Sequence, residues 1–241
     1  MKKTFLSDAR RMQELAGILS ESEKEEKLKK IFVLIGPPSV GKSTWINSTF
    51  KDIEPYIINR DDIVDEVASE YGWTYDDMFM SPPKDSEIGD IDGEYGEVVK
   101  SPSYMSWQPL SFSRVLEANN KVANKFNSLV DGARGKDNIV VDMTNMNANS
   151  RKRALDAISG NEDEYKKIAV VFNFQGIEDL IKKVAEKRAK AAKEMGKSKT
   201  IGPDVFDKMF SSYREVSSSE VFDEVINVDN TENLKKALEN G

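Results

Sequence analysis

The residues best suited to chemistry lie at 36–45, which read GPPSVGKSTW and directly follow the apolar run IFVLI. They match the pattern G-x-x-x-x-G-K-[ST], placed between an expected strand and an expected helix. In such a loop backbone N–H groups surround phosphates, the lysine reaches the β- and γ-phosphates, and the serine hydroxyl helps to hold Mg²⁺. The sequence therefore predicts a site for ATP and Mg²⁺. Its expected residues are Gly36, Ser39, Gly41, Lys42, Ser43 and Thr44.

Aspartates follow two further expected strands. Asp61 and Asp62 come after YIINR, and Asp142 ends the run IVVD. The carboxyl ends of parallel strands face the ligand crevice, so these carboxylates are expected near the γ-phosphate. Asp61 or Asp62 can accept the proton of an attacking hydroxyl, or can instead cap the next helix. Asp142 resembles the acid of a Walker-B strand, which acts on Mg²⁺ or its waters. Asn147 either belongs to the polar residues of the site that follow Asp142 or caps the next helix.

A basic stretch follows late in the chain. Residues 182–199 contain eight lysines and arginines against two acids, in a chain whose net charge is −7. This clustering predicts a lid over residues 182–200 that closes on phosphates, with Arg188 chosen as the arginine that stabilises the transferring group. The alternative interpretation is a solvated helix face.

Strands and helices alternate to position these groups. Runs typical of strands at 30–36, 56–62, 138–145, 167–174 and 224–228 are separated by segments with helical spacing, which predicts an α/β fold with a central parallel sheet flanked by helices. We divide the chain into an N-terminal helical extension, 1–30, and a P-loop domain, 31–241, interrupted by a long insertion at 72–110. The extension carries an apolar stripe, which suggests a homo-oligomer formed through this helix.

Composition narrows the functional classes. The 241 residues include no cysteine and no histidine, so proton transfer falls to carboxylates, lysines or tyrosines. No apolar run approaches the roughly 18 residues that span a bilayer, so we expect no membrane partner and a cytoplasmic location. The segment DIDGE at 90–94 lacks both a preceding apolar strand and a full set of calcium ligands, which argues against a phosphatase or a calcium loop.

In order along the chain, GPPSVGKSTW, INRDD, DMTNMN and DLIKKVAEKR resemble the kinase domain of the bacteriophage polynucleotide kinase family. The likeness spans roughly residues 31–217, with 72–110 poorly matched. It implies a P-loop kinase fold of the adenylate-kinase type and transfer of the γ-phosphate of ATP to a 5′-hydroxyl of DNA or RNA. By this resemblance Asp61 is the general base, Asp142 and Thr144 line the acceptor side, and Arg188 is the lid arginine.

The chain departs from the family at the acceptor. The family has an arginine three positions after its catalytic aspartate, where this chain has Val64. Arg60, Arg114 or Arg153 could replace it. Aromatic residues of the insertion could stack on bases or anchor the loop to the core. The acceptor is therefore a polynucleotide 5′-hydroxyl, a hydroxyl on a modified base, or a small nucleoside-like molecule. A non-catalytic ATP-gated binding protein is the alternative of another class.

Overall fold

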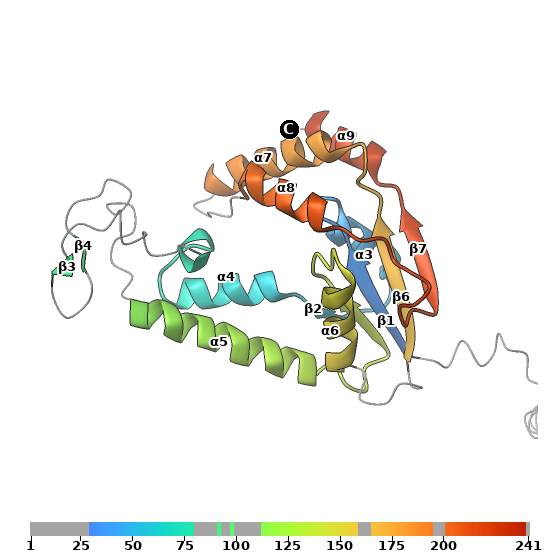
Figure 1. The fold of residues 1–241 in the computed structure, drawn as a ribbon, viewed down its shortest axis with the longest axis horizontal. Coiled ribbons are helices and arrows are strands. Elements are labelled where there is room, and N and C mark those ends of the chain that lie inside the picture. The colour runs from blue at the N-terminus through green and yellow to red at the C-terminus, as the bar shows by residue number, and fades with distance from the viewer. Residues whose placement is uncertain are drawn as a thin grey trace, which may run out of the picture.

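The computed structural model describes residues 29–79, 91–92, 97–98, 112–158, 165–194 and 201–239. The expected N-terminal helix up to residue 28, most of the 72–110 insertion and the end of the expected lid lie outside these residues. Lys29 and Lys30, which were expected in the helical extension, belong to the first strand instead. Five parallel strands form the main sheet in the order β2-β5-β1-β6-β7 (Figure 1). They are β1 (Lys29–Ile35), β2 (Tyr56–Ile58), β5 (Asn138–Val141), β6 (Tyr165–Phe172) and β7 (Glu224–Val228).

Helices connect the strands, as the alternating pattern predicts. They are α3 (Lys42–Thr49), α4 (Arg60–Glu70), α5 (Phe112–Asp131), α6 (Ala148–Ile158), α7 (Glu178–Glu194), α8 (Pro203–Ser212) and α9 (Thr231–Glu239). A short 3-10 helix, η1, spans Asp76–Phe79, and β3 (Ile91–Asp92) pairs antiparallel with β4 (Glu97–Val98). The expected α/β fold with a parallel sheet flanked by helices is confirmed.

Side chains of alternate residues on β1 point to opposite faces of the sheet, and both faces are covered. Ile31, Val33 and Ile35 pack with apolar residues of α5 and α6. Phe32 and Leu34 pack on the other face with apolar residues of α3, α7, α8 and α9. Burial on both faces explains why the strand sequences are continuously apolar rather than alternating.

A third apolar cluster lies away from the sheet. It joins α4, α5 and η1, and Figure 1 shows α4 and α5 running side by side away from the strands. Its buried residues are Ile63, Val64, Val67, Ala68, Met78, Ala118 and Val122. Exposed ion pairs from Lys121 and Lys125 to Glu70 and from Lys125 to Glu66 add to the contact between the two helices. The cluster therefore fixes the direction in which α4 leaves the sheet.

Arg151 of α6 is fully buried, and all five N–H groups of its guanidinium are used. Nε and one NH2 proton bind the two Glu220 carboxylate oxygens, both at 2.7 Å. The remaining protons go to the carbonyl oxygens of Asn145, Arg214 and Glu215. This arginine therefore ties the chain after β5 to the segment that follows α8.

Among the described residues, no helix is both long and apolar enough to cross a membrane.

Replacing Arg151 by methionine should lower the free energy of unfolding by about 3–5 kcal/mol, because Glu220 and three carbonyl groups lose their buried partner. Urea denaturation of wild type and variant measures this difference. Arg153→Met is the matched control, since Arg153 lies exposed on the same helix. Equal losses in the two variants would contradict a structural role specific to Arg151.

The same ion pair predicts a pH dependence of stability. Hydrogen bonds from Arg151 hold the pKa of Glu220 below its ordinary value of 4.5. A lowered folded-state pKa stabilises the protein above the unfolded-state pKa, and this stabilisation is lost as pH falls through the folded-state value. The difference in free energy of unfolding between wild type and Glu220→Gln should therefore stay constant down to about pH 5.5 and shrink below it. A difference that grows on acidification would contradict the assignment.

Candidate functional site

The three strands that carry the predicted site residues end side by side. Val141 of β5 is in register with both Val33 of β1 and Ile58 of β2. Three residues beyond each member of this row lie Thr144, Gly36 and Asp61 respectively. The N–H of Gly36 donates to the Thr144 carbonyl at 3.0 Å, and the N–H of Asp142 donates to the Ile58 carbonyl at 2.9 Å. The sheet thus brings the phosphate loop and both aspartates to one edge.

The loop itself has the backbone of an anion site. Ser39 has φ 63° and Gly41 has φ 102°, so two residues adopt left-handed conformations and turn the chain into α3. Gly41 is the N-cap of α3 and has no side chain to cover the first N–H groups of the helix. These groups and the helix dipole attract an anion such as phosphate.

Lys42 lies across the mouth of the loop. Its Nζ donates to the carbonyl oxygens of Gly36 at 3.1 Å and Pro37 at 3.2 Å. The ammonium is therefore already within the loop, at the place where a triphosphate needs positive charge. The residues fit the predicted nucleotide.

Asn230 supports the loop from the far end of the chain. Its side chain is 8% exposed, and its Nδ2 donates to the Val40 carbonyl at 2.9 Å. A Cβ at position 41 would lie 1.7 Å from that nitrogen, so the second glycine of the motif is required by packing as well as by its positive φ. The sequence offered only a weak signal for Asn230, an asparagine beside the last strand.

Asn145 is a second buried support. It is 2% exposed, has φ 47°, and donates through Nδ2 to the Leu34 carbonyl at 2.9 Å, just before the phosphate loop. Asparagine tolerates this left-handed conformation better than most residues. Its own carbonyl accepts from Arg151, so the loop end of β1 is linked to the buried arginine.

Asp61 does not cap α4, because Asn59 does. The Asn59 Oδ1 accepts from the Asp61 N–H at 2.8 Å. Asp61 and Asp62 lie exposed in the first turn of the helix, and the hydroxyl of Tyr75 donates to Asp61 Oδ1 at 3.0 Å. The capping alternative is therefore wrong for both aspartates, and Asp61 stays available as a general base.

Asn147, in contrast, is a helix cap. Its Oδ1 accepts from the Ser150 N–H at 3.0 Å, and its carbonyl accepts from the Arg151 N–H, so it closes the start of α6. The capping interpretation is confirmed here.

The expected Mg²⁺ ligands follow two neighbouring strands. Ser43 is in the first turn of α3 and Asp142 follows β5, the strand paired with β1. No group of three or more acidic residues, histidines or cysteines gathers around a possible metal position in the part of the chain that is described. Mg²⁺ in kinase sites uses one or two carboxylates together with substrate phosphates, so a serine and one aspartate fit the ion.

Two basic residues of α7 have structural partners. Lys182 pairs with Asp207 of α8 at 2.6 Å, and Lys187 donates to the carbonyls of Ala237 and Leu238 at the end of α9. These contacts hold α7 against its neighbours. Arg188 lies exposed on the same helix, so its role as the lid arginine stays a prediction.

The side chain of Val64 is buried inside α4's contact with α5. It is 2% exposed and packs in the cluster between α4 and α5. Arg60 and Arg153 are exposed, and the side chain of Arg114 lies outside the described residues. An arginine at position 64 would be buried in apolar surroundings. The acceptor side of the site therefore differs in this chain from the family pattern.

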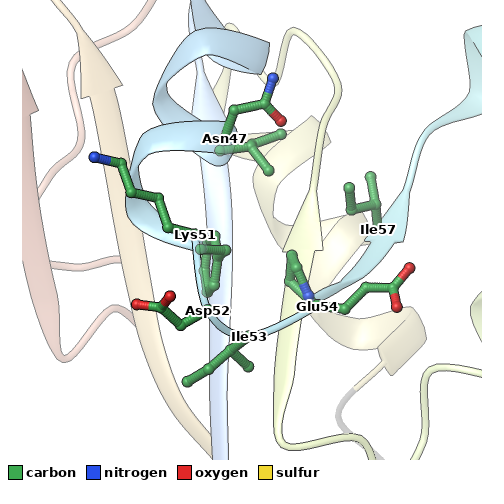
Figure 2. A pocket seen from close by; sticks show the side chains of 9 residues that line it. Asn47, Lys51, Asp52, Ile53, Glu54 and Ile57 are labelled. Carbon is green, nitrogen blue, oxygen red and sulfur yellow. The ribbon is translucent and has the colours of Figure 1, made fainter.

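A hollow of about 420 Å³ lies at the other end of α3 (Figure 2). It is formed by the last turns of α3, the loop 51–55 and Ile57 of β2, with Lys51, Asp52 and Glu54 around it. No residue of the phosphate loop lines it. This hollow is separate from the nucleotide site.

Comparison with solved structures finds distant likenesses. A protein of the PezAT toxin-antitoxin system of Streptococcus pneumoniae aligns at TM-score 0.45 and 12% identity, covering 85% of this chain and 70% of the other. A gluconokinase from Sinorhizobium meliloti gives TM-score 0.33 and 13% identity, covering 88% and 89%. A sugar kinase from Janibacter gives TM-score 0.38 and 10% identity, covering 88% and 91%. At these values the likenesses say nothing about the substrate of this chain.

No curated protein matches the sequence. A family model described as an AAA domain matches residues 31–216, which include the phosphate loop, both aspartates and the basic helix. Since this match covers most of the sequence, the chain belongs to the AAA domain family.

Proposed function

We propose that this protein is an ATP- and Mg²⁺-dependent kinase that transfers the γ-phosphate to a hydroxyl group. The observation that carries the proposal is the shared row of Val33, Val141 and Ile58, which sets Asp61 at the same strand edge as the phosphate loop. A site that only binds a nucleotide needs the loop, but transfer of the γ-phosphate to a hydroxyl also benefits from a base beside it.

In the proposed reaction the loop N–H groups and Lys42 hold the triphosphate. The acceptor oxygen attacks the γ-phosphorus, its proton passes to Asp61, and the bond between the γ-phosphorus and the bridging oxygen breaks to release ADP. Ser43 and Asp142 would hold Mg²⁺, which would supply positive charge against the phosphates. The Thr144 carbonyl accepts from the N–H of Gly36, so its backbone lies beside the loop, and Thr144 is proposed on the acceptor side. Arg188 of α7 is proposed as the lid arginine that stabilises the transferring phosphate group.

The resemblance to polynucleotide kinases makes a 5′-hydroxyl of DNA or RNA, or a hydroxyl on a modified base, the first proposed acceptor. One observation favours a small-molecule hydroxyl instead. The exposed face of α4 next to Asp61 carries Asp62, Asp65 and Glu66, and Val64 is turned into the apolar cluster. Such a face repels a phosphate backbone. The phosphate-transfer assay described below therefore decides which class of acceptor the enzyme uses.

Lys42→Ala should lower phosphate transfer by about 10²–10³-fold, because the ammonium within the loop stabilises charge on the transferring group. Transfer of labelled γ-phosphate measures the rate, and a fluorescent ATP analogue measures nucleotide binding. Lys183→Ala is the control, since Lys183 is exposed on α7. An equal loss in both variants would show that the loop lysine has no special role.

Asp61→Asn should abolish most of the transfer, by about 10²–10⁴-fold, while ATP binding is retained, because the amide cannot accept the proton. The assay offers 5′-hydroxyl DNA and RNA oligonucleotides, duplexes with hydroxymethyl bases, and free nucleosides. Asp62→Asn, a neighbouring exposed carboxylate, is the matched control.

The molecule that carries the labelled phosphate decides between the candidate functions. Label on an oligonucleotide establishes a polynucleotide kinase, and label on nucleosides alone establishes the small-molecule alternative. Tight ATP binding by the wild type with no labelled product would contradict the kinase and favour an ATP-gated binding protein.

A further inference from the structure

Tyr75 reaches the proposed base from outside the sheet. Its hydroxyl donates to Oδ1 of Asp61 at 3.0 Å. Tyr75 follows Asp61 by 14 residues and lies beyond the end of α4, at the start of the expected insertion. This hydrogen bond restricts the rotation of the Asp61 side chain.

The backbone around Tyr75 is fixed by hydrogen bonds. Thr74 donates through its N–H and its hydroxyl to Asp77 Oδ2, at 2.6 and 2.8 Å, and Asp77 donates back to the Thr74 hydroxyl at 3.4 Å. This reciprocal pair caps the start of η1. The N–H of Trp73 also donates to the Ala68 carbonyl of α4 at 2.8 Å. The chain is thereby folded back along α4.

The ring of Tyr75 packs against the apolar cluster of α4, α5 and η1. Burial, and then the charges of Asp61 and Asp65, raise the pKa of the Tyr75 phenol above its usual range. The phenol therefore stays protonated at working pH, so it remains a hydrogen-bond donor and does not act as a base itself.

We propose that Tyr75 is the positioning residue of the proposed base: it binds Oδ1 of Asp61 and so orients the carboxylate toward the acceptor hydroxyl. This inference rests on the proposed function. It also makes the start of the insertion part of the reaction site, since the residue that orients the base belongs to the segment that follows α4. The start of the insertion and the first turn of α4 then act together in the reaction.

The test compares Tyr75→Phe with Tyr71→Phe. Both rings contact the same apolar cluster, but the hydroxyl of Tyr71 interacts with Glu117 of α5 rather than with Asp61. Full-length proteins are assayed with Mg²⁺ and γ-labelled ATP, with and without the acceptor panel described above. Tyr75→Phe should lower kcat about tenfold, as expected for loss of a hydrogen bond to a charged group, with the KM for ATP unchanged. Tyr71→Phe should match the wild type.

A double substitution separates positioning from folding. If Tyr75 acts through Asp61, Tyr75→Phe should cause no further loss in the Asp61→Asn background, because the base it orients is already absent. Wild-type rates in Tyr75→Phe, equal losses in Tyr75→Phe and Tyr71→Phe, or additive losses in the double variant would each overturn the inference. Absence of both label transfer and ATP hydrolysis in the wild type would instead overturn the proposed function, and the role of Tyr75 with it.

Discussion

The register of three neighbouring strands is the constraint on which the site depends. β5 lies between β1 and β2, and Val141 fixes where both neighbours end. The phosphate loop leaves β1 and the helix of Asp61 leaves β2, so neither segment approaches the other through direct strand pairing. A shift of one residue in either pairing would turn the alternating side chains to the opposite face and move one half of the site away from the other. The apolar residues that cover both faces of the sheet therefore also keep the phosphate loop and Asp61 at matching heights.

Buried polar side chains then hold the loops that the strands place. Asn145 binds the end of β1, Asn230 binds the phosphate loop, and Arg151 binds the carbonyl of Asn145. Each lies in an apolar interior where an unmade hydrogen bond is costly, so each specifies one loop conformation. On the side of Asp61, the apolar cluster of α4, α5 and η1 sets the direction of α4 and packs against the ring of Tyr75. The phosphate side and the base side are supported independently.

The sequence predicted the elements and the loop because these depend on local patterns. Continuous apolar runs gave the buried strands, and the glycine and lysine spacing gave the anion site. The cap of α4 was missed, because Asn59, Asp61 and Asp62 are all good capping residues and only the backbone decides between them. The roles of Asn145, Arg151 and Asn230 could not be predicted, since each partner lies far away in the sequence. Helical spacing likewise could not show that Lys187 of the basic stretch binds the end of α9.

The central claim is that Asp61 faces a hydroxyl placed in line with the γ-phosphate in the loop. A crystal structure with Mg²⁺, ADP and aluminium fluoride as a mimic of the transferring group tests it most directly. Aluminium fluoride is expected within reach of Lys42, with a water or acceptor oxygen on its far side, about 3 Å from an oxygen of Asp61. A complex in which the Asp61 carboxylate points away from the aluminium fluoride, and another group contacts the apical oxygen, would contradict it.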